Sequence, residues 1–311
     1  MPPSTRVMPW RHKALLFDSV ETVLQSRVAS TAGYIANDCV EYKWLFRELV
    51  VTEHQSKILF ISRESIAEMP PTLIRELPLT GLQPEAAIAL LQTFHLTASD
   101  TELARLATGY QGHPQALEQL ATLIINDLEF AGNVGKFLQD RDWLLIRELE
   151  KLTDEIIARL SDIERTCLGR ISIYQTAEYS LDCGAIAAQM PEVSLYELKE
   201  DIIRALKRRH LLEYHPEIRS FQLHPLLRAK GEIMLWKNPE NLRAAHRQAY
   251  KYFLNIPLKP EAEWQEIEYI KPLHLVHYHA KQAEDEEEAA AAISRIECLC
   301  RVGTAHQQDD R

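Results

Sequence analysis

The chain has 311 residues, 46% of them hydrophobic, and no glycine- or proline-rich tract, which predicts two or three ordinary globular domains. Its formal net charge of −10 argues against bulk nucleic-acid affinity, because such binding needs lysine and arginine to displace counterions from phosphates. No apolar run approaches the ~18 residues that cross a bilayer, and the first residues lack the apolar core of a signal peptide. We therefore expect a cytoplasmic protein, with its five cysteines reduced because none has C-x-x-C spacing.

Two short apolar runs near the N-terminus predict the first strands, ALLFDSVE (14–21) and KILFISRE (57–64). Each ends on charged residues, as buried parallel strands do when they deliver a functional side chain to the carboxyl edge of a sheet. Residues 41–51 between them have a helical pattern, so a right-handed strand-helix-strand unit fits the spacing. Asp18 could hold Mg²⁺ and Arg63 could meet phosphate, which is half of a phosphoryl-transfer site.

The other half, a phosphate-binding loop, is missing from these residues. A loop of the form G-x-x-x-x-G-K-[ST] surrounds phosphates with backbone N–H groups and one lysine at a helix start. The nearest segment is Gly132–Phe137, where the glycines are three apart, phenylalanine replaces the hydroxyl residue and no strand precedes. We reject that segment as a phosphate loop.

Residues 80–150 predict a small helical domain. Pro84 suits a first helical position, and Ser99 with Glu102 has the S-x-x-E spacing of a capping box. That helix should end at Gly109, and Pro114 should open the next one.

Residues 151–232 predict a winged helix. S-x-x-E boxes at 161–164 and 194–197 each open an amphipathic run, and the alternating segments 211–215 and 220–223 are typical of a hairpin. Residues 233–311 are helical by pattern, and the acidic run 284–288 fits a first helical turn because acids there complement the helix dipole.

Four motifs in this order resemble the NB-ARC branch of the STAND signalling ATPases, over about the whole chain from residue 14. LLFDSVETVLQ is similar to the Walker B strand of that family and ILFISRE to its sensor-arginine strand. GYQGHPQALEQLA is similar to the G-x-P motif, and FQLHPLLRAKG to the M-H-D motif that ends the winged helix.

The resemblance implies a fold and a set of site residues. The fold is α/β plus mostly α: an incomplete P-loop NTPase sheet (1–79), a helical lid (80–150), a winged helix (151–232) and the start of a helical superstructure (233–311). The implied function is a nucleotide-operated switch, in which Asp18 binds Mg²⁺ and Arg63 senses the terminal phosphate of ATP. Pro114 would lie against adenine, and His224 would contact the β-phosphate of ADP.

Departures from the family pattern weaken nucleotide binding. Ser19 stands where the family carries a second acid or an asparagine, and Pro225 replaces the last acid of M-H-D. A lost phosphate loop removes three or four charge-assisted hydrogen bonds of ~1.5–3 kcal/mol each, so affinity should fall by roughly 10⁴ to 10⁷. We therefore expect weak ADP or ATP binding and no independent ATPase activity.

Because strands of the family's sheet are missing, the remaining strands have edges with unpaired backbone N–H and C=O groups, which can pair with a strand of another chain. Two hypotheses follow: another polypeptide completes the sheet in a signalling assembly, or the chain is a degenerate member that persists as a nucleotide-free scaffold. Arg63 has an ordinary alternative as the ion-pair partner of Glu21 or Glu64, and His224 as a packed histidine that closes the hairpin.

Two other functions have less support. The basic stretch Lys207–His210 suggests DNA binding, but residues 161–231 hold ten Lys and Arg against ten Asp and Glu, so the winged helix lacks a basic face. His274, His277 and His279, with Cys298 and Cys300, suggest zinc, but His279 should point away from the other two on a helix.

Overall fold

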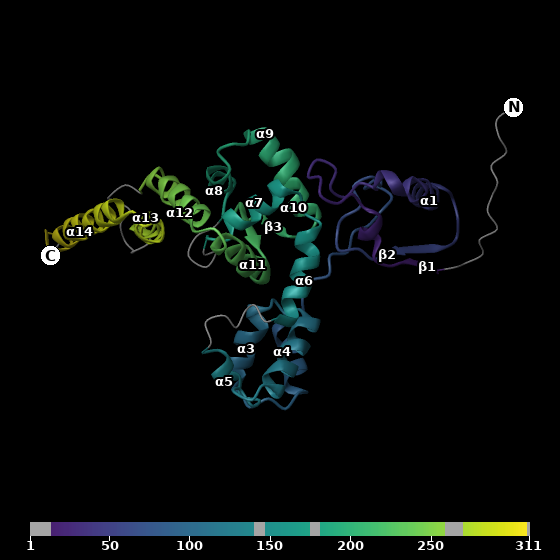
Figure 1. Ribbon diagram of the computed structural model, residues 1–311, viewed down its shortest axis with the longest axis horizontal. Helices are drawn as coiled ribbons and strands as arrows, with labels where there is room; N and C mark the ends of the chain where they lie inside the picture. Colours follow the sequence, from purple (N-terminus) through teal and green to yellow (C-terminus); the bar gives the residue numbers. More distant parts are fainter. Residues whose placement is uncertain (1–13, 140–146, 175–180, 259–269, 310–311) are drawn as a thin grey trace. The chain divides into compact units, whose positions relative to one another are not determined.

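The computed structural model describes residues 14–139, 147–174, 181–258 and 270–309, and it is mostly helical with two small two-stranded sheets (Figure 1). It divides into two compact units. The first comprises Met1–Glu164 and Lys199–Glu213, and the second comprises Arg165–Leu198 and Tyr214–Arg311. The border between them lies inside the segment expected to form a winged helix, and the four-part division of the sequence stays a prediction.

The first unit contains a two-stranded parallel sheet. Strands β1 (Ala14–Phe17) and β2 (Lys57–Phe60) pair in register from Ala14↔Lys57 to Phe17↔Phe60, and α1 (Val40–Val51) connects them. The fully buried Phe46 of α1 packs edge-on against both Phe17 and Phe60. The predicted strand-helix-strand unit is confirmed, and α1 covers one face of its sheet.

A helical bundle follows in the same unit (Figure 1). It contains α2 (Pro84–Gln92), α3 (Asp100–Gly109), α4 (Pro114–Asn126) and the short α5 (Val134–Phe137). The predicted helix starts are confirmed: Pro84 and Pro114 begin their helices, and Ser99 and Glu102 form a reciprocal capping box. Residues with no exposed surface form the core, including Leu91, Leu106, Leu117, Leu120 and Ile124. Helix α6 (Arg147–Ala158) leads out of the bundle.

Shorter elements follow, namely α7 (Asp162–Ile171), α8 (Cys183–Gln189), α9 (Leu195–Glu197), α10 (Arg204–Arg208), β3 (Leu212–His215) and β4 (Ser220–Leu223). Strands β3 and β4 form the second sheet, as the hairpin pattern predicts. One difference from the expected helix is that Leu198–Ile203 form a π-helix between α9 and α10. The buried positions Leu198, Ile202 and Leu206 have ordinary helical spacing, so the sequence pattern does not reveal the wider turn.

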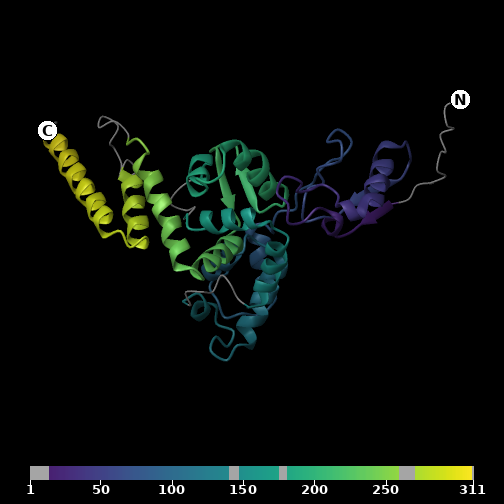
Figure 2. The same cartoon turned by 45° about the horizontal axis from the view of Figure 1, so that its top comes forward.

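The second unit ends in helices α11 (Pro225–Trp236), α12 (Pro239–Leu254), α13 (Lys271–Gln282) and α14 (Glu286–Asp309). Helix α12 packs on α13, and α13 packs on α14, as both views show (Figures 1 and 2). Glu286, Glu287 and Glu288 lie in the first turn of α14, where acids were expected. Within the described ranges, none of the helices combines the length and apolar character needed to span a membrane.

Candidate functional site

The carboxyl ends of β1 and β2 meet at one edge of the sheet. Beyond the last paired residues, the Ile61 N–H donates to the Phe17 carbonyl at 2.8 Å, and the Val20 N–H donates to the Ile61 carbonyl at 3.0 Å. These bonds keep the segments after β1 and β2 side by side, and Asp18 and Arg63 lie in these segments. The expectation that the two strands are parallel neighbours is therefore confirmed.

Asp18 lies in a strained turn at this edge. Its side chain is exposed, and Oδ1 accepts the N–H of the next residue, Ser19, at 2.8 Å. Ser19 has a φ of 56°, a left-handed conformation that non-glycine residues seldom adopt. The carboxylate thus has a local turn-forming role, while its exposure leaves it open to a cation.

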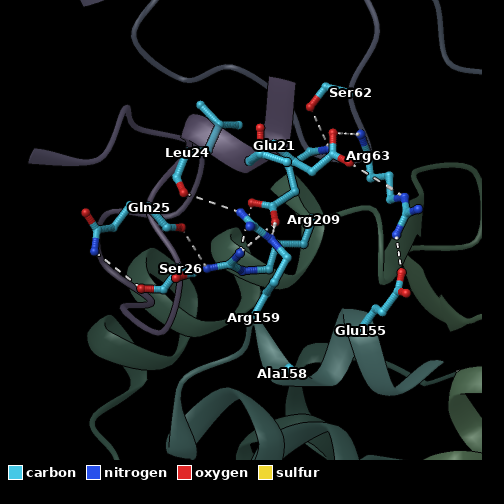
Figure 3. Close-up of polar contacts among 12 residues, drawn as sticks. Glu21, Leu24, Gln25, Ser26, Ser62, Arg63, Glu155, Ala158, Arg159 and Arg209 are labelled. Atoms are coloured by element: carbon cyan, nitrogen blue, oxygen red, sulfur yellow. Dashed lines mark hydrogen bonds and ion pairs between the residues drawn. The ribbon is translucent and has the colours of Figure 1, made fainter. Parts of the chain in front are cut away.

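Arg63 is occupied by two carboxylates of its own chain (Figure 3). Its Nη1 lies 3.4 Å from Oε2 of Glu155 in α6, and its Nε lies 3.7 Å from Oε1 of the buried Glu21. Its backbone N–H also donates to Glu21 Oε2 at 3.2 Å. The alternative pairing with Glu21 is therefore present, and within the described residues Arg63 forms no ion pair with Asp18.

Pro114 and His224 both begin helices. Pro114 is the first residue of α4, whose N-cap His113 accepts the Ala116 N–H through Nδ1 at 3.3 Å. His224 is the N-cap of α11 and accepts the Leu226 N–H through Nδ1 at 3.2 Å. Pro114 belongs to the first unit and His224 to the second. Each position has a helix-starting role that needs no nucleotide.

Sequence reasoning missed a buried ion-pair network beside this edge, formed by Glu64, Arg159, Glu164 and Arg209. Arg209 donates to both Glu64 oxygens at 2.9 and 2.8 Å and through Nε to Glu164 Oε1 at 3.0 Å. Arg159 Nε donates to Glu64 Oε1 at 2.5 Å. The side chains of Arg209, Glu64 and Glu164 are only 2%, 4% and 0% exposed to solvent. We call these four residues the clasp.

The sequence holds little sign of the clasp, because three of its residues lie outside helices and only Glu164 belongs to one, α7. The predicted capping box at Glu164 is confirmed, because its Oε2 accepts the Ser161 N–H at 2.8 Å. Its other oxygen meets Arg209, which lies 45 residues away in the chain. Such a distant pairing has no spacing by which it could be recognised.

The basic stretch Lys207–His210 is largely engaged within the first unit. Arg208 donates to the Ala32 carbonyl at 3.1 Å and lies over the ring of Tyr34, while Arg209 is buried in the clasp. His210 Nε2 lies 3.3 Å from Ser65 Oγ. DNA phosphates would have to compete with these contacts, which further weakens the DNA-binding hypothesis.

The histidines near the C-terminus do not gather around a metal. His279 is buried against His246, His277 Nδ1 lies 3.0 Å from the Ala289 carbonyl, and His274 is exposed. No group of three or more candidate ligands suited to a metal occurs in the part of the chain that the structure describes. The side chains of Cys298 and Cys300 lie outside the described residues.

Comparison with known proteins adds no assignment: no protein-family model matches the chain, and no curated protein matches it.

Proposed function

We propose that this chain is the regulatory module of a STAND-type nucleotide switch, and that its phosphate-binding loop comes from a segment outside these 311 residues. The observation that supports it best is the parallel pairing of β1 and β2, which carries Asp18 and Arg63 to one sheet edge. Ligands of open α/β sheets bind outside the carboxyl ends of the strands. An acid and an arginine at that edge suit a magnesium-bound phosphate.

Each site residue has a proposed role. The exposed Asp18 carboxylate would hold Mg²⁺, which proteins usually bind through one or two carboxylates together with the phosphates of the nucleotide. Arg63 would leave Glu155 and meet the terminal phosphate. By resemblance alone, Pro114 would lie against adenine and His224 would contact the β-phosphate of ADP. One carboxylate and one arginine form an incomplete site, so binding by these residues alone should be weak.

A partner polypeptide is the second part of the proposal. Leu16 and Leu59 are paired directly across the strands, and they are 62% and 54% exposed on the sheet face opposite to Phe17 and Phe60. Parallel sheets are almost always covered on both faces. We propose that a strand and helix from outside these residues cover this face and extend the sheet.

A nucleotide-free scaffold is the second candidate, favoured by the ion pairs of Arg63 with Glu21 and Glu155. In that case the carboxylates satisfy the arginine permanently, and the bare sheet face serves protein binding alone.

Calorimetric titration with MgADP separates the two candidates. We expect the chain alone to bind MgADP with a Kd above about 1 mM. Tight binding of MgADP by the chain alone would show that no outside loop is needed. The coding DNA on either side should next be read for G-x-x-x-x-G-K-[ST], and the titration repeated with that segment present.

With that segment present, we expect micromolar binding that Arg63→Ala weakens about 10- to 100-fold, the value of one charge-assisted hydrogen bond. Arg47→Ala is the matched control, because Arg47 is an exposed arginine of α1 in the same unit. If the two segments together still fail to bind MgADP, the scaffold is the correct function.

A further inference from the structure

Three consecutive residues at the end of α10, Arg208 to His210, connect this segment to the strand-bearing part of the first unit. The Arg208 carbonyl accepts the Ser65 N–H at 2.7 Å, Arg209 reaches Glu64, and His210 lies beside the Ser65 hydroxyl. A second connection comes from Arg159, just after α6: its Nε donates to Glu64 Oε1 at 2.5 Å, and its carbonyl accepts the Arg27 N–H at 2.7 Å. The loop after β2 is thus bound to two segments that are far away in the chain.

The clasp is charge-balanced, and three of its four side chains are buried, whereas that of Arg159 is 25% exposed. Its two arginines and two glutamates sum to zero, and the carbonyls of Leu24 and Gln25 accept further N–H groups from Arg159 and Arg209 at 3.4 Å (Figure 3). Both Glu64 oxygens and both Glu164 oxygens have donors. A buried network of this kind is stable only when every member is present.

This all-or-none property gives the clasp two discrete states. Moving Arg209 partly away would leave the buried Glu164 without a counter-charge and Glu64 with Arg159 alone, which is unfavourable, so we expect partly open states to be rare. When the segments separate fully, water solvates all four charged groups and the penalty disappears. Arg27 and His210, which flank the clasp, have φ values of 62° and 54°, and such left-handed strain is common at switching segments.

We propose that the clasp is a conformational latch: it locks residues 199–213 and the end of α6 to the loop after β2, and it opens in a single step. The adjacency of Arg63 and Glu64 would link this latch to the sheet edge. An anion that drew Arg63 away from Glu155 and Glu21 would remove contacts that hold residue 63, the neighbour of Glu64 in the chain. That linkage rests on the proposed function, whereas the latch itself does not.

Hydrogen exchange on the nucleotide-free protein tests the latch independently of any ligand. We expect Arg209→Met to accelerate amide exchange at least tenfold in residues 25–27, 62–67 and 207–213 together, with α2, α3 and α4 unchanged. Arg204→Met is the matched control, because Arg204 is an exposed arginine of α10, the helix that Arg209 caps, and it pairs with the partly exposed Glu200.

Glu64→Gln provides a second variant of almost unchanged shape, in case Arg209→Met does not fold. The same three segments should accelerate together, by a smaller factor. The latch is refuted if exchange stays at the wild-type rate in these segments, if only one of them accelerates, or if the whole first unit accelerates uniformly. If MgADP still fails to bind with the outside segment present while the three segments accelerate together, only the proposed function is contradicted.

Discussion

At the scale of single residues, Gly112 shows how one backbone position joins two elements. Its carbonyl accepts the Leu82 N–H at 2.8 Å, which holds the segment before α2 to the connection between α3 and α4. Its φ is +66°, and a Cβ there would lie 2.2 Å from the Leu82 carbonyl oxygen. Only glycine allows both this conformation and this approach.

Gly112→Ala should therefore lower the free energy of unfolding more than Gly132→Ala. Gly132 has a similar φ of +81°, but no atom lies within 4 Å of its added Cβ. We expect about 1–2 kcal/mol of left-handed strain at Gly132, and at Gly112 the same strain plus a steric overlap. Urea denaturation measures both values, and equal losses would contradict the close approach to Leu82.

At the scale of elements, α12 and α13 are joined by two buried histidines. The Nδ1 atoms of His246 and His279 lie 2.8 Å apart, and Phe253 stacks on His279. Tyr174 and Tyr278 lie edge-on to His279 and are the titratable neighbours of the pair. Burial lowers the pKa of His246 to about 4, and burial with the charge of His246 lowers that of His279 to about 3.

These lowered pKa values predict acid sensitivity. Both histidines are neutral in the folded and unfolded states well above pH 6.5, so they do not make stability pH-dependent there. As the pH falls from about 6.5 toward 4, the unfolded state binds protons that the folded state rejects, and stability is lost. The loss is on the order of 1.4 kcal/mol per pH unit for each histidine.

The double variant His246→Leu, His279→Phe should flatten this part of the curve of unfolding free energy against pH. Urea midpoints measured from pH 7.5 to 4.5 provide the check. His274→Phe is the control, because His274 is an exposed residue of the same helix α13 and its replacement should preserve the acid-side loss. If the unfolding free energy of the double variant falls with pH as steeply as that of the wild type, the histidine pair does not cause the acid sensitivity.

At the scale of the whole molecule, exposed apolar side chains gather in residues 14–79. They include Leu16, Val40, Trp44, Val51, Leu59, Ile61, Leu77 and Leu79. They belong to separate surfaces: Val40, Trp44 and Val51 lie at helical spacing on α1, whereas Leu16 and Leu59 form the sheet face opposite to the one that α1 covers. Exposed apolar faces of this kind are typical of surfaces that bind another protein.

The variant Leu16→Lys, Leu59→Glu should reduce binding of the dye ANS while changing the unfolding free energy by less than about 1 kcal/mol. Both side chains are more than half exposed, so their replacement removes little buried area. Leu128→Lys is the control for an exposed leucine in another part of the chain, since Leu128 is 98% exposed. A large loss of stability would show that this face is already covered.

Local chemistry explains which features the sequence determined by itself. Caps, helix-starting prolines and alternating apolar residues act over a few positions, so Pro84, the Ser99 capping box and the β3–β4 hairpin were predictable. The parallel pairing of β1 and β2 was also predictable, because two strands joined through one helix have few ways to pair. The nucleotide roles of Asp18, Arg63, Pro114 and His224 stay predictions.

Only the tertiary structure decided which charged side chains of the first unit pair with one another. Arg63 meets Glu155, and Arg209 meets Glu64 and Glu164, over separations of 92, 145 and 45 residues. A charged side chain has no periodicity that specifies a distant partner, and its burial is favourable only once that partner is in place. Spacing along the chain therefore predicts where an element begins, whereas the pairing of buried charges follows from how the elements pack.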